Sequence, residues 1–317
     1  MRIDFAPMEG ITDDLFRTLH HRYFPGVDRY FTPFLSPTED GITKKERAQV
    51  LPENNPGLTL VPQLLTRQAE SFLAAAKALE ALGCTEVNLN LGCPSGTVTA
   101  KGKGAGFLAP FRRQELEEFL DRIFAACPLD ISIKTRLAME DPEEFPAILE
   151  LLGRYPIKEL ILHPRVRADF YKLPVRMEWF RYAMAHSRAP VCLSGGVAGK
   201  ADFDRLMSDP AAPDAVMLGR GLVADPSLAE KCRGGAGADR ATLEEFFGVL
   251  FQETASRLGN PRSTMFRMKE LWSYFILLFD NREKYQKALR RATSVTEFEA
   301  VVARIFKELP LRESAEL

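Results

Sequence analysis

A cysteine follows a buried-strand pattern in the stretch EVNLNLGCPSG, residues 86–96. Gly92 and Pro94 stand on either side of Cys93, and neither continues a strand easily, so the thiol belongs to a turn. The five cysteines are odd in number and form no CxxC pair, which indicates neither a disulfide framework nor a zinc site. Cys93 is therefore a candidate for thiol chemistry of its own. The other four are expected to be small apolar side chains: Cys84, Cys127, Cys192 and Cys232.

Polar residues also stand at the ends of neighbouring strand patterns. They are Gln63, Asn90, Lys134, Arg136, His163, Arg165 and Ser194, with glycines at 195–196 and a GRG at 219–221. One of them alone could cap a helix or lie satisfied in a core, but residues on six successive strands call for a common explanation. Barrel enzymes place their active sites at the C-terminal ends of strands, so these residues are expected to surround a ligand.

The last two strand ends indicate a phosphorylated cofactor. SGG at 194–196 and GRG at 219–221 put backbone N–H groups and an arginine where many barrels hold a phosphate. Lys134 and His163, from adjacent strands, could stabilise negative charge on a ring that accepts electrons, such as a reduced flavin. The four histidines have no spacing typical of a metal site, so no metal is expected.

Short apolar runs alternate with amphipathic stretches over the first three quarters of the chain, a pattern typical of parallel strand and helix repeats. The predicted strands are residues 2–8, 30–36, 58–64, 86–92, 130–136, 159–165, 190–196 and 215–221. Residues 67–83 and 112–127 have helical periodicity, and Gly83 stands where a left-handed cap would end the first helix. The sequence predicts an α/β fold, a (β/α)8 TIM barrel.

The strand patterns stop near residue 240, and a smaller all-α domain is expected to follow. Three or four amphipathic helices are predicted from residues 242–259, 265–279 and 295–309. The glycine-rich residues 233–242 are the predicted linker. The expected domains are therefore a cofactor-binding barrel at 1–236 and a helical domain at 237–317.

Charge and hydropathy limit the possible partners. A net charge of −1 excludes a generally electrostatic nucleic-acid binder, although residues 257–291 contain nine basic and three acidic side chains. There is no apolar run of about 18 residues, and the N-terminus lacks the layout of a secretion signal. A soluble, cytoplasmic protein is expected, with no membrane association and no protein partner implied.

Several motifs follow one another between residues 5 and 221: APMEGITDDLFR, LVPQLL, NLNLGCPS with KGKGAGFL, IKTR, LHPR, SGG and AVMLGRG. Together they resemble the tRNA-dihydrouridine synthases of the bacterial branch, and RMKELWSYF is similar to that family's RNA-binding helices. The resemblance implies a (β/α)8 barrel with a helical domain, FMN as cofactor and NADPH as reductant. It implies reduction of the C5–C6 double bond of specific uridines in tRNA.

The resemblance also assigns roles to residues. The flavin would contact Pro7, Met8, Glu9, Gln63, Lys134 and His163, and its phosphate side would contact Ser194, Gly195, Gly196, Gly219 and Arg220. Asn90 would hold the uracil, and the other expected tRNA contacts are Lys101, Arg165, Arg267 and Lys269. Cys93 would give a proton to C5 while the reduced flavin delivers a hydride to C6. A thiol suits this role because its pKa of about 8.5 keeps it protonated at neutral pH.

Two other functions are compatible with parts of this pattern. A flavin-dependent barrel oxidoreductase acting on a free pyrimidine would use the same strand ends but would not need a basic helical domain. A tRNA-binding chaperone would not need Cys93. The combination of Cys93, Lys134 and His163 favours an active enzyme.

Overall fold

The computed structural model describes residues 1–315 and divides into two compact units. The first contains Met1–Glu9, Asp28–Gly196 and Ala211–Met217; the second contains Gly10–Val27, Val197–Pro210 and Leu218–Leu317. Within residues 1–315 no helix is long and apolar enough to span a membrane. The domain boundary at 236/237 stays a prediction, because the two units are interleaved along the sequence.

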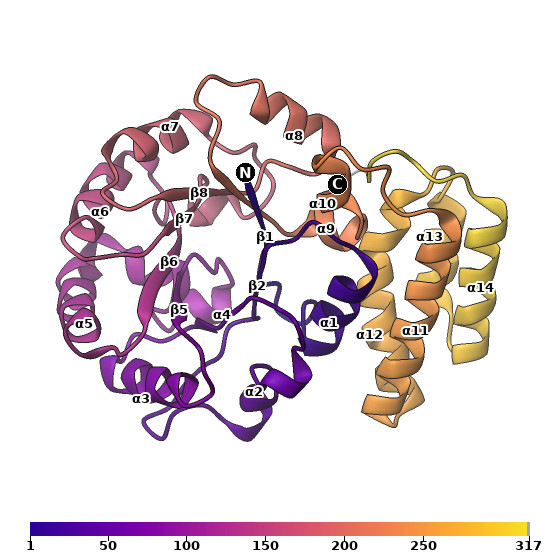
Figure 1. Cartoon of the computed structure of the whole chain (residues 1–317), viewed down its shortest axis with the longest axis horizontal. Coiled ribbons are helices and arrows are strands. Elements are labelled where there is room, and N and C mark those ends of the chain that lie inside the picture. Colours follow the sequence, from indigo (N-terminus) through magenta and orange to yellow (C-terminus); the bar gives the residue numbers. More distant parts are fainter. Residues whose placement is uncertain (316–317) are drawn as a thin grey trace. The chain divides into compact units, whose positions relative to one another are not determined.

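The strands form one nine-stranded sheet with the order β3-β2-β1-β9-β8-β7-β6-β5-β4 (Figure 1). Their bounds are β1 Arg2–Phe5, β2 Arg29–Phe31, β3 Leu60–Val61, β4 Gln63–Leu64, β5 Glu86–Leu91, β6 Asp130–Arg136, β7 Leu160–His163, β8 Val191–Ser194 and β9 Ala215–Leu218. The first two strands are shorter than predicted, since Pro7 and Pro33 follow them and lack the N–H that a ladder needs.

The sheet closes into a barrel at Pro62. Strands β3 and β4 are the two ends of the sheet order, yet only Pro62 separates them along the chain. The first half of this segment pairs with β2 and the second half with β5, both in parallel. Residues 60–64 therefore act as one barrel strand, and the predicted eight-stranded barrel is confirmed.

The barrel interior is layered. Near the start of the strands, Arg29 forms ion pairs with Asp4 at 2.7 Å and Glu159 at 2.5 Å, and all three side chains are largely buried. An apolar layer follows, made of Ala6, Phe31, Val61, Ile161, Cys192, Ala215 and Met217. The paired charges are satisfied by one another, as burial in a low-dielectric interior requires.

Helices of the first unit surround its strands (Figure 1). They are α2 Lys44–Ala48, α3 Ala69–Glu80, α4 Gly96–Thr99, α5 Arg113–Ala126, α6 Phe145–Leu152 and α7 Met177–His186, with 3-10 turns η1 Pro52–Asn54, η2 Gly104–Leu108, η3 Pro110–Arg112, η4 Pro142–Glu144 and η5 Arg167–Asp169. Helix α3 buries the predicted face through Phe72, Ala75, Ala76 and Leu79, and Leu82 is half-buried. Gly83 has the predicted left-handed conformation, with φ +86°.

The second unit is helical. Its helices are α1 Asp14–Tyr23, α8 Lys200–Met207, α9 Arg220–Ala224, α10 Leu228–Cys232, α11 Arg240–Leu258, α12 Pro261–Phe275, α13 Glu283–Arg291 and α14 Val295–Glu308, with the 3-10 turn η6 Ile276–Leu278. The side chains of Asp239, Asn260 and Ser294 cap the N-termini of α11, α12 and α14. The helices predicted after residue 240 are thus present.

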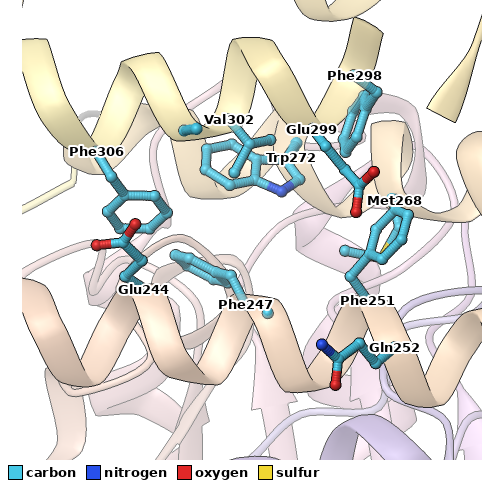
Figure 2. A pocket seen from close by; sticks show the side chains of 12 residues that line it. Glu244, Phe247, Phe251, Gln252, Met268, Trp272, Phe298, Glu299, Val302 and Phe306 are labelled. Carbon is cyan, nitrogen blue, oxygen red and sulfur yellow. The ribbon is translucent and has the colours of Figure 1, made fainter. Parts of the chain in front are cut away.

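A pocket of about 190 Å³ lies in this unit among α11, α12 and α14. Figure 2 shows Phe247, Trp272 and Phe306 among the side chains that line it, and their rings pack together at centroid distances of 5.2 to 5.9 Å. Glu244 and Glu299 also line the pocket and are exposed. The aromatic lining is thus part of the helical core.

Candidate active site

The loop that carries Cys93 is held by the side chain of Asn90. The amide oxygen of Asn90 accepts hydrogen bonds from the backbone N–H groups of Gly92, at 3.0 Å, and Cys93, at 2.9 Å. On the other side, the N–H of Ala105 donates to the Cys93 carbonyl at 3.1 Å. A Cβ at Gly104, where φ is +57°, would lie 2.9 Å from the Cys93 Cβ. Position 104 therefore requires glycine if the cysteine loop is to pack as it does.

A buried chain of hydrogen bonds supports Asn90 from below. Its amide nitrogen donates to the Gln63 oxygen at 2.7 Å, and the Gln63 nitrogen donates to Asn88 at 2.8 Å. Asn88 donates to the hydroxyl of Ser132 at 2.9 Å, and that hydroxyl donates to Glu86 at 2.6 Å. Gln63, Asn88 and Ser132 are fully buried. This chain of amides fixes which way the Asn90 side chain faces.

The surroundings of Cys93 keep its thiol protonated. Burial raises the pKa of Cys93, and the carboxylate of Glu9 also raises it. The Ser95 backbone, Arg136 and Lys134 lower this pKa, but the effect of burial is larger. At neutral pH the site therefore presents a half-buried S–H group that can donate a proton, with cations nearby that favour the thiolate left behind.

Arg136 connects the cysteine loop to the segment after β7. Its Nε donates to the carbonyl of Gly92 at 3.0 Å, and its Nη1 donates to the carbonyls of Val166, at 3.0 Å, and Phe170, at 2.8 Å. Its guanidinium also lies 5.2 Å from the ring centre of Tyr171. The strand-end pattern singled out Arg136, but nothing in the sequence assigned it this bridging role.

Lys134 and Arg165 give the strand ends a positive character, and the His163 ring lies beside Arg165. Burial, together with the nearby charge of Arg136, lowers the pKa of Lys134 to about 8. Lys134 has no carboxylate ion pair within residues 1–315. The Nε2 of His163 lies 2.7 Å from Arg165 Nη1, and both side chains are buried. Such a site favours an anionic ligand, because the lysine forms no ion pair with a carboxylate in the described part of the chain.

Two glycines shape the end of β8. Gly195 and Gly196 follow Ser194 with φ of +90° and +82°. A Cβ at Gly195 would lie 2.9 Å from the His163 ring, and one at Gly196 would lie 2.7 Å from Val175. The backbone thus passes close to His163 in a conformation that favours glycine. Gly219 and Arg220 follow β9, begin α9 and belong to the second unit.

The remaining predicted cofactor residues follow β1. Pro7 and Met8 are half-buried, and Glu9 is exposed by surface area. The carboxylate of Glu9 nevertheless acts on the Cys93 thiol, so this segment and the cysteine loop share one neighbourhood. The structure therefore brings Glu9, Gln63, Asn90, Cys93 and Lys134 together. No group of three or more His, Cys, Asp or Glu side chains within residues 1–315 is arranged to hold a metal ion.

The predicted tRNA contacts are in different environments. Lys101 is exposed, whereas Arg165 is buried and donates to the Leu173 carbonyl as well as approaching His163. In the second unit, Arg267 donates to the Ile11 carbonyl at 2.6 Å and pairs with Asp13 at 3.0 Å. Lys269 donates to the carbonyls of Arg290 and Ala292 at the C-terminal end of α13. A role for these residues toward RNA stays a prediction.

Comparison with known families decides the classification. The family model described as "Dihydrouridine synthase (Dus)" matches residues 4–309, and thus nearly the whole chain. The chain belongs to this family. The match includes the cysteine loop and the helices α11 to α14, so both the barrel and the helical segment are part of the family pattern.

Individual relatives agree with this classification. A tRNA-dihydrouridine(16) synthase of Shewanella oneidensis is 27% identical over 92% of this chain and 93% of its own. One from Neisseria meningitidis is 27% identical over 97% of this chain and 96% of its own. A probable tRNA-dihydrouridine synthase 1 of Synechocystis is 30% identical over 72% of this chain and 63% of its own.

Solved structures share the fold. A 2-naphthoyl-CoA reductase complex superposes with a TM-score of 0.57 at 12% identity, over 74% of this chain and 50% of its own. Morphinone reductase superposes with a TM-score of 0.54 at 15% identity, over 76% of this chain and 88% of its own. At these identities the likeness concerns the barrel fold alone.

Proposed function

We propose that this dihydrouridine synthase family member is a flavin-dependent oxidoreductase that converts specific uridines in tRNA to 5,6-dihydrouridine. The observation that carries the proposal is the protonated thiol of Cys93, held by Asn90 on a loop of the barrel. Relatives that align along almost the whole chain are named for position 16 of tRNA. Their names support uridine 16 as the target.

The residues present fit a flavin. Lys134 lies beside the cysteine loop as a cation without a carboxylate ion pair within residues 1–315, so an anionic ring edge would suit it. We propose that Lys134, His163 and Gln63 hold the pyrimidine edge of FMN, that Pro7, Met8 and Glu9 lie along its ring, and that Ser194, Gly195, Gly196, Gly219 and Arg220 receive its phosphate side. Bound FMN, once reduced by NADPH, would supply the hydride for C6 of the uracil.

Cys93 supplies the proton. Its thiol would donate to C5 of the uracil, because burial keeps the thiol protonated until the reaction draws the proton away. The thiolate that remains is stabilised by Arg136 and Lys134 and regains a proton from solvent. Asn90 was predicted to hold the uracil, and its hydrogen bonds to the cysteine loop add a second role, which is to position the acid.

The substrate is a tRNA, which must present its uridine outside the base stack. Lys101, Arg165, Arg267 and Lys269 are the proposed tRNA contacts, of which Lys101 is fully at the surface. A cytoplasmic location follows from this substrate and from NADPH as the reductant. A flavin barrel acting on a free pyrimidine is less well supported, because the family match extends through the helices to residue 309.

Nucleoside analysis tests the proposal. The purified protein is incubated with FMN, NADPH and unmodified tRNA, and the digested RNA is examined by mass spectrometry. A gain of two hydrogens on uridine is expected, at position 16 when the RNA is mapped. If tRNA stays unchanged while NADPH is consumed and a free pyrimidine is reduced, the proposed substrate is wrong.

A pair of cysteine variants tests the acid. Cys93→Ala should retain FMN and tRNA binding but lose most turnover, because no other proton donor is held on that loop. Cys84→Ala is the matched control, since Cys84 is also half-buried and its pKa is also raised by burial. Equal turnover of the two variants would remove Cys93 from the mechanism.

A further inference from the structure

Phe111 is exposed to an unusual degree. Its side chain is 84% exposed, more than any other large apolar residue within residues 1–315. It lies in the turn η3, where the N–H of Arg112 donates to the carbonyl of Ala109 at 2.8 Å. The residues just before it, Phe107, Leu108 and Ala109, are buried. The turn thus presents one aromatic ring to the exterior, where its face is open to a ligand.

The ring stands among cations. The guanidinium of Arg112 lies 5.3 Å from the centre of the Phe111 ring. The same guanidinium lies against Gly102, where φ is +68° and an added Cβ would lie 2.7 Å from the Arg112 Cζ. Gly102 lies between Lys101 and Lys103 in the sequence. The Arg112 guanidinium therefore packs against the chain between these two lysines.

The charge of this surface is mostly uncompensated. Burial lowers the pKa of Lys103, and the nearby charges of Lys101 and Arg67 lower it further, so these cations lie close enough to repel. Glu115 pairs with Arg67 and with Arg112, the latter at 2.6 Å. The Glu115 carboxylate thus pairs with two of the four cations, and Lys101 and Lys103 have no carboxylate ion pair within residues 1–315. We call Arg67, Lys101, Lys103, Phe111 and Arg112 the Phe111 surface.

The Phe111 surface is tied to the cysteine loop. Directly after Lys103, Gly104 and Ala105 contact Cys93, Gly104 through its close approach to the Cys93 Cβ and Ala105 through its hydrogen bond to the Cys93 carbonyl. Gly106 fits equally closely against Thr99 of α4, where a Cβ would lie 2.6 Å from the Thr99 oxygen. The segment that carries Lys101 and Lys103 therefore continues directly into residues packed against the cysteine loop.

We propose that Phe111 is a stacking platform for an unpaired RNA base next to the uridine that Cys93 protonates. When a uridine leaves its stack, its neighbours lose a stacking partner, and an exposed aromatic ring can replace it. Lys101, Lys103 and Arg112 hold the phosphates on either side. An aromatic ring within a cationic surface is the combination that binds single-stranded RNA. This inference rests on the proposed tRNA substrate and adds a residue that the sequence did not indicate.

Four variants test the platform. Phe111→Ala should raise the Kd for unmodified tRNA by about tenfold, as expected for the loss of one base–aromatic stack. Phe111→Trp should bind as tightly as the parent, whereas Phe111→Leu should bind like the alanine variant, because leucine has no ring to stack. Met184→Ala, which removes another exposed apolar side chain on α7, is the control and should bind like the parent. FMN content reports the folding of each variant.

The outcomes separate this inference from the proposed function. The Kd is measured by fluorescence with Cys93→Ala protein, so binding is observed whether or not uridine is reduced. Equal Kd values for Phe111→Ala and Met184→Ala would overturn the platform. A leucine variant that binds like the parent would indicate an apolar protein contact instead, and a change of sedimentation without a change in Kd would indicate a second copy of the chain. Absence of dihydrouridine with the parent protein, together with weaker tRNA binding by Phe111→Ala, would overturn the proposed reaction and leave Phe111 as an RNA contact.

Discussion

The amide oxygen of Asn90 accepts hydrogen bonds from the backbone N–H groups of Gly92 and Cys93, at 3.0 and 2.9 Å. Its amide nitrogen donates to the side-chain oxygen of Gln63, so this one side chain makes three hydrogen bonds within the protein. Asn90 therefore determines where the Cys93 thiol lies as well as any contact that it makes with a substrate.

Replacing Asn90 should affect catalysis through this loop. Asn90→Leu leaves two backbone N–H groups without their acceptor, at a cost of about 1–3 kcal/mol each, and turnover should fall at least tenfold. Asn90→Asp keeps the acceptor and should retain more activity than the leucine variant. For the parent and both variants, kcat is measured alongside the pH profile of Cys93 alkylation by iodoacetamide. If both variants alkylate like the parent, Asn90 does not position the thiol.

The pH dependence of the reaction should reflect the raised pKa of Cys93. Only the protonated thiol can give its proton to C5, and burial raises its pKa above the value of about 8.5 for a free thiol. The alkylation midpoint of Cys93 should therefore lie above pH 8.5, and single-turnover reduction should stay constant through neutral pH. A midpoint below 7 would mean that the resting group is a thiolate, and the acid would have to be sought elsewhere.

Lys134 should strengthen FMN binding and lower the stability of the folded chain. Its pKa is lowered to about 8, so the charged lysine destabilises the folded chain at neutral pH, and stability should rise with pH between about 8 and 10.5. The shift corresponds to at most about 3 kcal/mol. Lys134→Met should thus raise the thermal midpoint of the cofactor-free protein while weakening FMN binding. A variant that loses stability and keeps its FMN affinity would contradict this role.

The ion pairs within the barrel should respond differently from those at its surface. Arg29→Met removes the more buried of the two arginines that pair with Asp4 and Glu159 and leaves only Arg2, which should cost about 3–5 kcal/mol. Arg154→Met breaks the exposed pair with Glu117 and should cost less than about 1 kcal/mol. Urea unfolding of the two variants measures the difference, and similar losses would show that the inner pairs contribute no more than surface pairs.

The strands could be predicted from the sequence because their apolar runs are separated by long amphipathic stretches. The way the barrel closes could not be predicted from the sequence. It depends on a change of pairing partner at Pro62, and the pattern of one strand does not show with which strands it pairs. Cys93 was recognisable because Gly92 and Pro94 mark a turn. The cofactor contacts were assigned from the resemblance of the motifs more than from the chemistry of single residues.

The parts of the site that escaped prediction depend on irregular backbone. Arg136 was noticed as a strand-end cation, but its acceptors are carbonyls of Val166 and Phe170, and Phe170 has φ of +50°, rare for a residue with a bulky side chain. Lys269 was predicted to contact RNA because it matches a basic position of the family, and the sequence did not show that its ammonium group also donates to the carbonyls of Arg290 and Ala292. Partners of this kind are fixed only when the chain has folded.

The change of pairing partner at Pro62 also affects the dynamics of the barrel. Strands of only two residues lie on either side of this proline, which has no amide proton of its own, so few backbone hydrogen bonds join the barrel there. Amide protons near this seam should exchange with solvent sooner than those of β5 and β6, which are paired over six positions. Gln63, the first residue beyond the seam, holds Asn90. Fluctuations that open the ring would therefore reach the cysteine loop before they reach the rest of the fold.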